Sequence, residues 1–171
     1  MVVSESQLVE AVARDRAAGR TVAFANGCFD LLHVGHLRYL QAAAAEAERL
    51  IVAVNDDRSV AGLKGEGRPI LPAAERAELV AALRCVSYVV VFGEANVERL
   101  LLLVKPDVHC KGTDYTVDTV PERAVVAGYG GRTAIVGDQK SHATRELLAR
   151  IGRPKDQEPG TRDQEQDRAT R

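Results

Sequence analysis

Hydrophobic and polar residues follow one another along this chain in blocks that predict buried strands and amphipathic helices in alternation. Runs such as residues 50–54 are apolar at every position, which is typical of parallel strands covered on both faces. The predicted strands cover residues 21–25, 50–54, 88–92, 108–110 and 133–136. A first helix, capped by Ser4 or Ser6, ends at Gly19, and the later predicted helices cover residues 36–48, 72–83, 97–104, 121–127 and 143–151.

Five strands separated by helices indicate an α/β fold with a doubly wound parallel sheet and right-handed crossovers. In sheets of this kind, ligands bind at the carboxyl ends of the strands. The residues that directly follow the predicted strands are therefore the first candidates for a functional site.

The first predicted strand runs into the sequence NGCFDLLHVGH, residues 26–36, which places His33 and His36 at the start of a helix. Backbone N–H groups and the helix dipole favour an anion at such a position. Gly27 closes the apolar strand, and Gly35 lies between the two imidazoles, where a Cβ atom would obstruct the approach of a ligand. A metal half-site is the alternative, but the remaining histidines lie far away in the sequence and no CxxC is present. The pattern favours a phosphate site.

Length and composition agree with one folded domain, predicted over residues 1–152. The net charge of -1 gives no electrostatic footprint for nucleic acid. No apolar run is long enough for a membrane span and the N-terminus does not resemble a signal peptide, so we expect a cytoplasmic protein that binds no membrane. Residues 153–171 are rich in charge and lack large apolar side chains, which predicts a disordered tail.

The three cysteines do not show the spacing of a disulfide framework and are interpreted as buried free thiols. For Cys28 the alternative is a reactive thiol, because it lies close to the histidines in the sequence.

Three further segments follow predicted strands and carry candidate ligand-binding side chains. The first includes Asn55 and Asp57 and continues into a glycine-rich loop, residues 62–69, in which Lys64 and Arg68 could close over a polyphosphate. The second is residues 111–115, KGTDY, and the third is residues 137–145, GDQKSHATR, where hydroxyls and cations open the last predicted helix. Ordinary turns and helix caps are the alternative explanation for the last two segments.

The segment GCFDLLHVGH resembles the GxFDxxHxGH signature of the cytidylyltransferase-like nucleotidyltransferases, which join a nucleoside triphosphate to a phosphorylated small molecule. Together with LIVAVNDDRS, LKGEGRPI, AERAELVAAL and VKPDVHCKGTDY, it resembles the bacterial heptose 1-phosphate adenylyltransferases over residues 5–151. This resemblance implies a Rossmann-like fold and the formation of ADP-heptose and pyrophosphate from ATP and D-glycero-β-D-manno-heptose 1-phosphate, with Mg²⁺. Many relatives carry a fused kinase domain, and without one this sequence is expected to be a stand-alone transferase.

The resemblance also implies roles for individual residues. Catalytic roles fall to His33, His36 and Lys64. Nucleotide or phosphate binding falls to Gly27, Phe29, Asp30, Gly35, Lys111, Asp114, Ser141, Thr144 and Arg145. The segments that follow the predicted strands add Asn55, Asp57, Arg68 and Tyr115 as candidates for substrate binding. No protein ligand to a metal is assigned.

One difference from the family's sequence pattern leaves the identity of the phosphorylated acceptor open. Related adenylyltransferases commonly begin the last helix with a run such as STT, whereas this chain has the sequence SHATR at residues 141–145. Cytidylyl or guanylyl transfer to glycerol 3-phosphate or another sugar phosphate is therefore an alternative, as is a non-catalytic nucleotide-binding module. A flavin or dinucleotide site is disfavoured because the first turn lacks GxGxxG. Relatives often form homodimers, and the sequence leaves the oligomeric state open.

Overall fold

A computed structural model describes residues 1–138 of the chain. The predicted helix over residues 143–151, the predicted tail, and the candidates Ser141, Thr144 and Arg145 lie outside these described residues.

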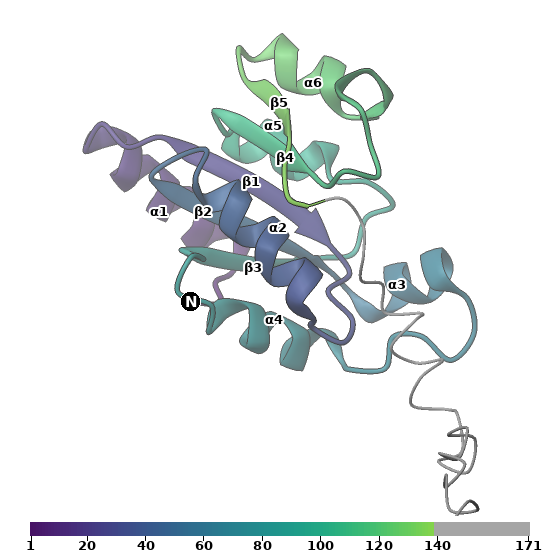
Figure 1. The fold of residues 1–171 in the computed structure, drawn as a ribbon. Helices are drawn as coiled ribbons and strands as arrows, with labels where there is room; N and C mark the ends of the chain where they lie inside the picture. The colour runs from purple at the N-terminus through teal and green to yellow at the C-terminus, as the bar shows by residue number, and fades with distance from the viewer. Residues whose placement is uncertain (139–171) are drawn as a thin grey trace, which may run out of the picture.

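A parallel five-stranded sheet in the order β3-β2-β1-β4-β5 forms the centre of the fold (Figure 1). The strands are β1 (Val22–Gly27), β2 (Arg49–Asn55), β3 (Tyr88–Phe92), β4 (Val108–Lys111) and β5 (Arg132–Ile135). Each overlaps one of the five runs predicted from the sequence, so the predicted α/β parallel sheet is confirmed. The strand order reverses between β1 and β4, and ligands bind beside such a reversal in doubly wound sheets.

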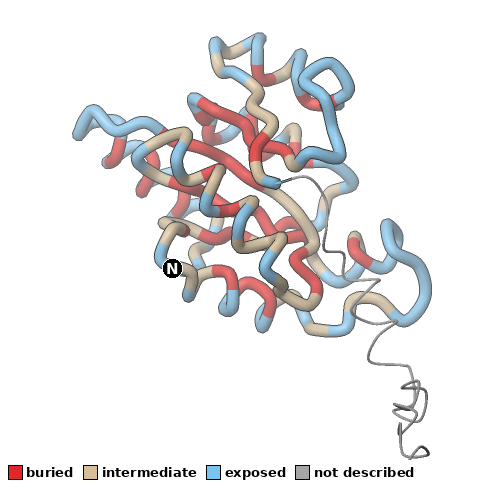
Figure 2. The backbone as a smooth tube through the Cα atoms, in the orientation of Figure 1, coloured by how far each residue is buried: buried red, intermediate tan, exposed pale blue. Residues whose placement is uncertain are grey.

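Helices cover both faces of the sheet, and a separate apolar cluster lies on each side. One cluster holds residues of α2 (Val34–Ala44) and α4 (Ala73–Ala81), and the other holds residues of α1 (Glu5–Ala17), α5 (Glu98–Val104) and α6 (Arg123–Gly128). Buried residues accordingly lie along β1, β2, β3 and β4, while exposed residues lie on the outer surfaces of the helices and in the loops (Figure 2). No helix in the described part of the chain is both long and apolar enough to cross a membrane.

The first helix begins as predicted, because Ser4 caps it and forms a reciprocal capping box with Gln7. The prediction for residues 36–48 was wrong at both ends, since α2 starts at Val34 and stops at Ala44. His33, rather than a later residue, is therefore the cap of α2.

The prediction of a glycine-rich loop from residue 62 was also wrong, because α3 occupies Asp57–Lys64 and the loop starts only at Gly65. The side chain of Asp56 accepts the Ser59 amide at 2.7 Å and so caps this helix. Among its residues only Val60 is buried, and Gly62 lies inside it, which explains why no apolar period revealed the helix. Lys64 therefore lies at the C-terminal end of a helix and not within a loop.

Candidate active site

The two histidines of the GCFDLLHVGH segment lie against each other at the start of α2. His33 caps the helix, and its Nδ1 atom accepts the Gly35 amide at 3.1 Å. The imidazole rings of His33 and His36 stack with centroids 3.8 Å apart, and the edge of Phe29 meets His36 at a centroid distance of 5.4 Å. The pair is therefore held at a helix N-terminus, where the amide dipoles favour an anion.

His36 is uncharged at neutral pH. Burial lowers its pKa to about 4, and electrostatic interactions with His33 and Lys64 act in the same direction while Asp30 opposes them. Its Nδ1 atom is buried without a hydrogen-bond partner among the described residues. A neutral imidazole keeps one N–H donor and adds no charge of its own, so His36 can donate a hydrogen bond to a phosphate oxygen.

The turn before the histidines has an unusual backbone. Phe29 and Leu31 adopt φ values of 48° and 56°, in the left-handed region that residues other than glycine rarely occupy. A Cβ atom at Gly27 would come within 3.2 Å of the Phe29 ring, so glycine lets this aromatic ring pack beneath the turn. Such strain persists only where surrounding contacts fix the backbone, and it is concentrated at functional sites.

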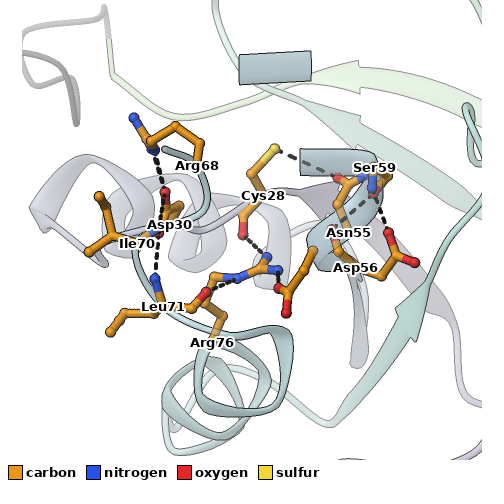
Figure 3. A network of polar contacts seen from close by, with 10 residues as sticks. Cys28, Asp30, Asn55, Asp56, Ser59, Arg68, Ile70, Leu71 and Arg76 are labelled. Carbon is orange, nitrogen blue, oxygen red and sulfur yellow. Dashed lines mark hydrogen bonds and ion pairs between the residues drawn. The ribbon is translucent and has the colours of Figure 1, made fainter. Parts of the chain in front are cut away.

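Asp30, which lies between the two strained residues, supplies those contacts. Its carboxylate accepts the Ile70 amide at 2.9 Å, the Leu71 amide at 3.2 Å and the Arg68 Nε atom at 2.6 Å (Figure 3). Burial alone would raise the pKa of Asp30, but the two amides and the guanidinium outweigh it and hold that pKa below its ordinary value. Asp30 and Arg68, both assigned to ligand binding from the sequence, are thus brought together with each other and join residues 68–71 to the turn.

Arg76, which was not predicted as a site residue from the sequence, makes a second set of contacts that holds the turn. Its side chain is fully buried and donates to the carbonyls of Leu71 at 2.9 Å and Cys28 at 2.5 Å, and to Asp57 Oδ1 at 2.8 Å (Figure 3). An arginine one turn before Val80, on the apolar face of the predicted helix, was the available signal. Through Arg76 the start of α3 is fastened to the histidine turn.

Lys64 is exposed at the C-terminal end of α3, where its charge adds to the lowering of the His36 pKa and partly opposes the rise that burial causes in the Cys28 pKa. The lysine and the histidines therefore share one side of the molecule, near the carboxyl ends of β1 and β2. Asn55 is buried at the end of β2, 4.0 Å from the Cys28 sulfur. Burial raises the pKa of the Cys28 thiol, which disfavours the nucleophilic thiolate.

The KGTDY segment lies at the end of β4, and its side chains differ in exposure. Lys111 is buried and donates to Asn26 Oδ1 at 3.1 Å and to Glu122 Oε1 at 3.3 Å. Burial lowers the pKa of Lys111, and Glu122 counteracts this effect. Asp114 and Tyr115 are exposed, and the Tyr115 ring lies 5.5 Å from the Lys111 ammonium. Neither Asn26 nor Glu122 was among the site residues chosen from the sequence.

We expect the free energy of unfolding to fall as the pH drops from about 6.5 to about 4. Burial lowers the folded-state pKa of His36 to about 4 and that of His109 to about 3, so the unfolded chain binds protons first. Each histidine should cost roughly 1.4 kcal/mol per pH unit in this window. Denaturant titrations at a series of pH values measure the slope. The variant His36→Gln should show a shallower slope than the wild type, and identical slopes would contradict the pKa of His36.

The chain is similar to several known proteins. The cytidylyltransferase-like family model matches residues 24–157. The "Bifunctional protein HldE" of Pseudomonas fluorescens (strain SBW25) is 45% identical over 150 residues, which is 88% of this chain and 32% of that protein. The protein of the same name from Geobacter sulfurreducens is 45% identical over 140 residues, covering 82% and 29%. The chain therefore spans about a third of the length of these curated relatives.

A solved structure described as the lipopolysaccharide core biosynthesis protein from Thermoplasma volcanium GSS1 aligns with a TM-score of 0.62 and 27% identity. The alignment covers 71% of this chain and all of that one.

Proposed function

The chain belongs to the cytidylyltransferase-like family, and we propose that it transfers AMP from ATP to D-glycero-β-D-manno-heptose 1-phosphate, giving ADP-heptose and pyrophosphate. The observation that carries this proposal is the stacked His33–His36 pair at the start of α2, inside the region that matches the family model. The 45% identity to proteins named HldE supports the adenylyl and heptose assignments.

In the proposed reaction, an oxygen of the sugar phosphate attacks the α-phosphorus of ATP. A new P–O bond forms while the bond to pyrophosphate breaks, so no covalent intermediate with the protein is needed. Catalysis then rests on positioning and on charge stabilisation. His33 and His36 would hold phosphate oxygens at the start of α2, and Lys64 would neutralise the charge that grows on the pyrophosphate leaving group.

The remaining ligand-binding roles are proposals of the same kind. Asp114 and Tyr115 are exposed after β4, where they can meet the nucleoside or the sugar. Arg68 and Asp57 act indirectly in this scheme, because Asp30 and Arg76 hold them. Ser141, Thr144 and Arg145 keep their proposed contacts with the triphosphate.

Nucleotidyltransferases generally use a divalent metal ion together with the nucleoside triphosphate. Residues 1–138 contain no group of three or more histidine, cysteine, aspartate or glutamate side chains arranged to hold such an ion. We propose Mg²⁺ as the ion and the phosphate oxygens of ATP as its principal ligands.

Pyrophosphate release tests the proposal directly. The protein is incubated with Mg²⁺, one of ATP, CTP or GTP, and either heptose 1-phosphate, other sugar phosphates or glycerol 3-phosphate. We expect the fastest release with ATP and heptose 1-phosphate. Faster release with CTP or GTP, or with glycerol 3-phosphate, would overturn the substrate assignment. Nucleotide binding without pyrophosphate release from any pair would indicate a non-catalytic module.

A further inference from the structure

A buried polar cluster joins the carboxyl ends of β1 and β4, beside the histidine turn. It consists of Asn26, His109, Lys111 and Glu122, and we call it the Asn26 cluster. The Oδ1 atom of Asn26 lies 3.1 Å from Lys111 Nζ and 3.3 Å from His109 Nε2. The strand register explains why these side chains lie together. Phe24 of β1 pairs with His109 of β4, and side chains two positions apart on a strand point to the same face of the sheet. Asn26 and Lys111 therefore lie on the same face as His109.

The cluster determines which way the Asn26 amide points. An ammonium group only donates hydrogen bonds, so the atom of Asn26 that faces Lys111 must be the oxygen. His109 is fully buried and its pKa is lowered to about 3, so its ring is neutral and can donate from Nε2 to the same oxygen. The amide nitrogen Nδ2 then points away from both donors. A flipped amide would place its NH₂ group against the ammonium.

Glu122 keeps Lys111 in place. The two charged side chains are 3.3 Å apart, and their exposed fractions are only 9% for Lys111 and 6% for Glu122. A buried ion pair of this kind is weak evidence for stability, because desolvation offsets much of the attraction. It does confine the ammonium to one position, and that position fixes the oxygen of Asn26.

The location of the cluster indicates what the oriented amide can do. Asn26 immediately precedes Gly27 of the histidine segment and lies at the end of β1, while Lys111 ends β4. The strand order reverses between these two strands, which is where doubly wound sheets bind their ligands. Asn26 is only partly buried, and in residues 1–138 the hydrogen bonds of its side chain all go to Oδ1.

We propose that Asn26 is a ligand-binding residue whose Nδ2 atom donates a hydrogen bond to a phosphate oxygen of the substrate, with Lys111 and His109 as positioning residues. The inference rests on the proposed function, because it needs a phosphorylated ligand at this edge of the sheet. The nucleotide and the sugar phosphate offer the same oxygen chemistry. The experiment therefore measures both.

The variant Asn26→Asp separates this role from a purely structural one. The aspartate has nearly the same shape and keeps an oxygen toward Lys111 and His109, but it replaces the donor by an anionic acceptor. We expect the KM for one of ATP and heptose 1-phosphate to rise by roughly tenfold or more, because a donated hydrogen bond to a charged oxygen becomes repulsion. The change in kcat should be smaller, and the melting temperature should not fall.

The double variant Asn26→Asp with Glu122→Gln restores the net charge of the cluster, so a KM that stays raised shows that the changed group at position 26, and not the net charge of the cluster, is responsible. The same measurements can be made on the double variant if the single variant does not fold. Both KM values within twofold of the wild type in a folded variant would overturn the inference. If the wild type shows no turnover, the proposed function fails separately, and calorimetric titration with ATP and with heptose 1-phosphate still decides the role of Asn26: equal affinities for wild type and variant would refute it.

Discussion

The variant His36→Ala is expected to lose turnover by about a hundredfold or more, because it removes a preorganised donor from the phosphate site. The imidazole of His36 is stacked on His33 and packed against Phe29, so its N–H group is aimed before any ligand arrives. Its pKa of about 4 keeps it neutral throughout the physiological range. We therefore expect kcat to fall while the pH dependence near neutrality shows no ionisation of this group. Pyrophosphate release under saturating ATP and sugar phosphate measures the loss.

Cys28→Ala is the matched control, because Cys28 lies in the same segment and its pKa is raised rather than lowered. That variant should retain turnover, since the proposed chemistry needs no nucleophilic thiolate. Circular dichroism should show that both variants keep the helices and the sheet. Near-normal turnover in a folded His36→Ala protein would refute the catalytic role of the histidine. A large loss in Cys28→Ala would instead implicate the thiol.

The arrangement of the sheet could be predicted because its signal is local. A buried parallel strand is apolar along its whole length, and residues 50–54 show this without reference to the rest of the chain. Helix α3 lacked such a signal. Its first turn is held by the Asp56 cap and by the bond from Arg76 to Asp57, and the second of these joins residues 19 positions apart.

The residues of the candidate site were likewise predictable from the sequence only where the signal is local. His33 and His36 were found because a short motif contains both, together with the strand and helix that place them. The roles of Asp30 and Arg68 could not be separated from ligand binding, since their contact spans 38 residues. Asn26 and Glu122 belong to a cluster that only the pairing of β1 with β4 creates. Charged residues near a motif thus suggested a site, but the structure shows which of them bind each other.

Arg76→Met is expected to lower the free energy of unfolding by about 2 to 4 kcal/mol, because it leaves the buried carbonyls of Cys28 and Leu71 without their donors. Methionine fills much of the same volume, so loss of packing should be a minor part of the effect. Turnover should also fall, since α3 and Lys64 lose their attachment to the histidine turn. Denaturant titration measures the first effect and pyrophosphate release the second.

Asp57→Asn is the comparison that separates the ion pair of Arg76 from its two hydrogen bonds to buried carbonyl groups. The Asp57 side chain is 52% exposed, so its ion pair with Arg76 should contribute less than about 1 kcal/mol. The variant keeps the guanidinium and both carbonyl bonds, and its stability should therefore stay close to that of the wild type. Equal losses in the two variants would place the energy in the ion pair rather than in the carbonyl bonds. A folded Arg76→Met protein as stable as the wild type would contradict the prediction. It would show that Arg76 does not hold the histidine turn, residues 68–71 and α3 together.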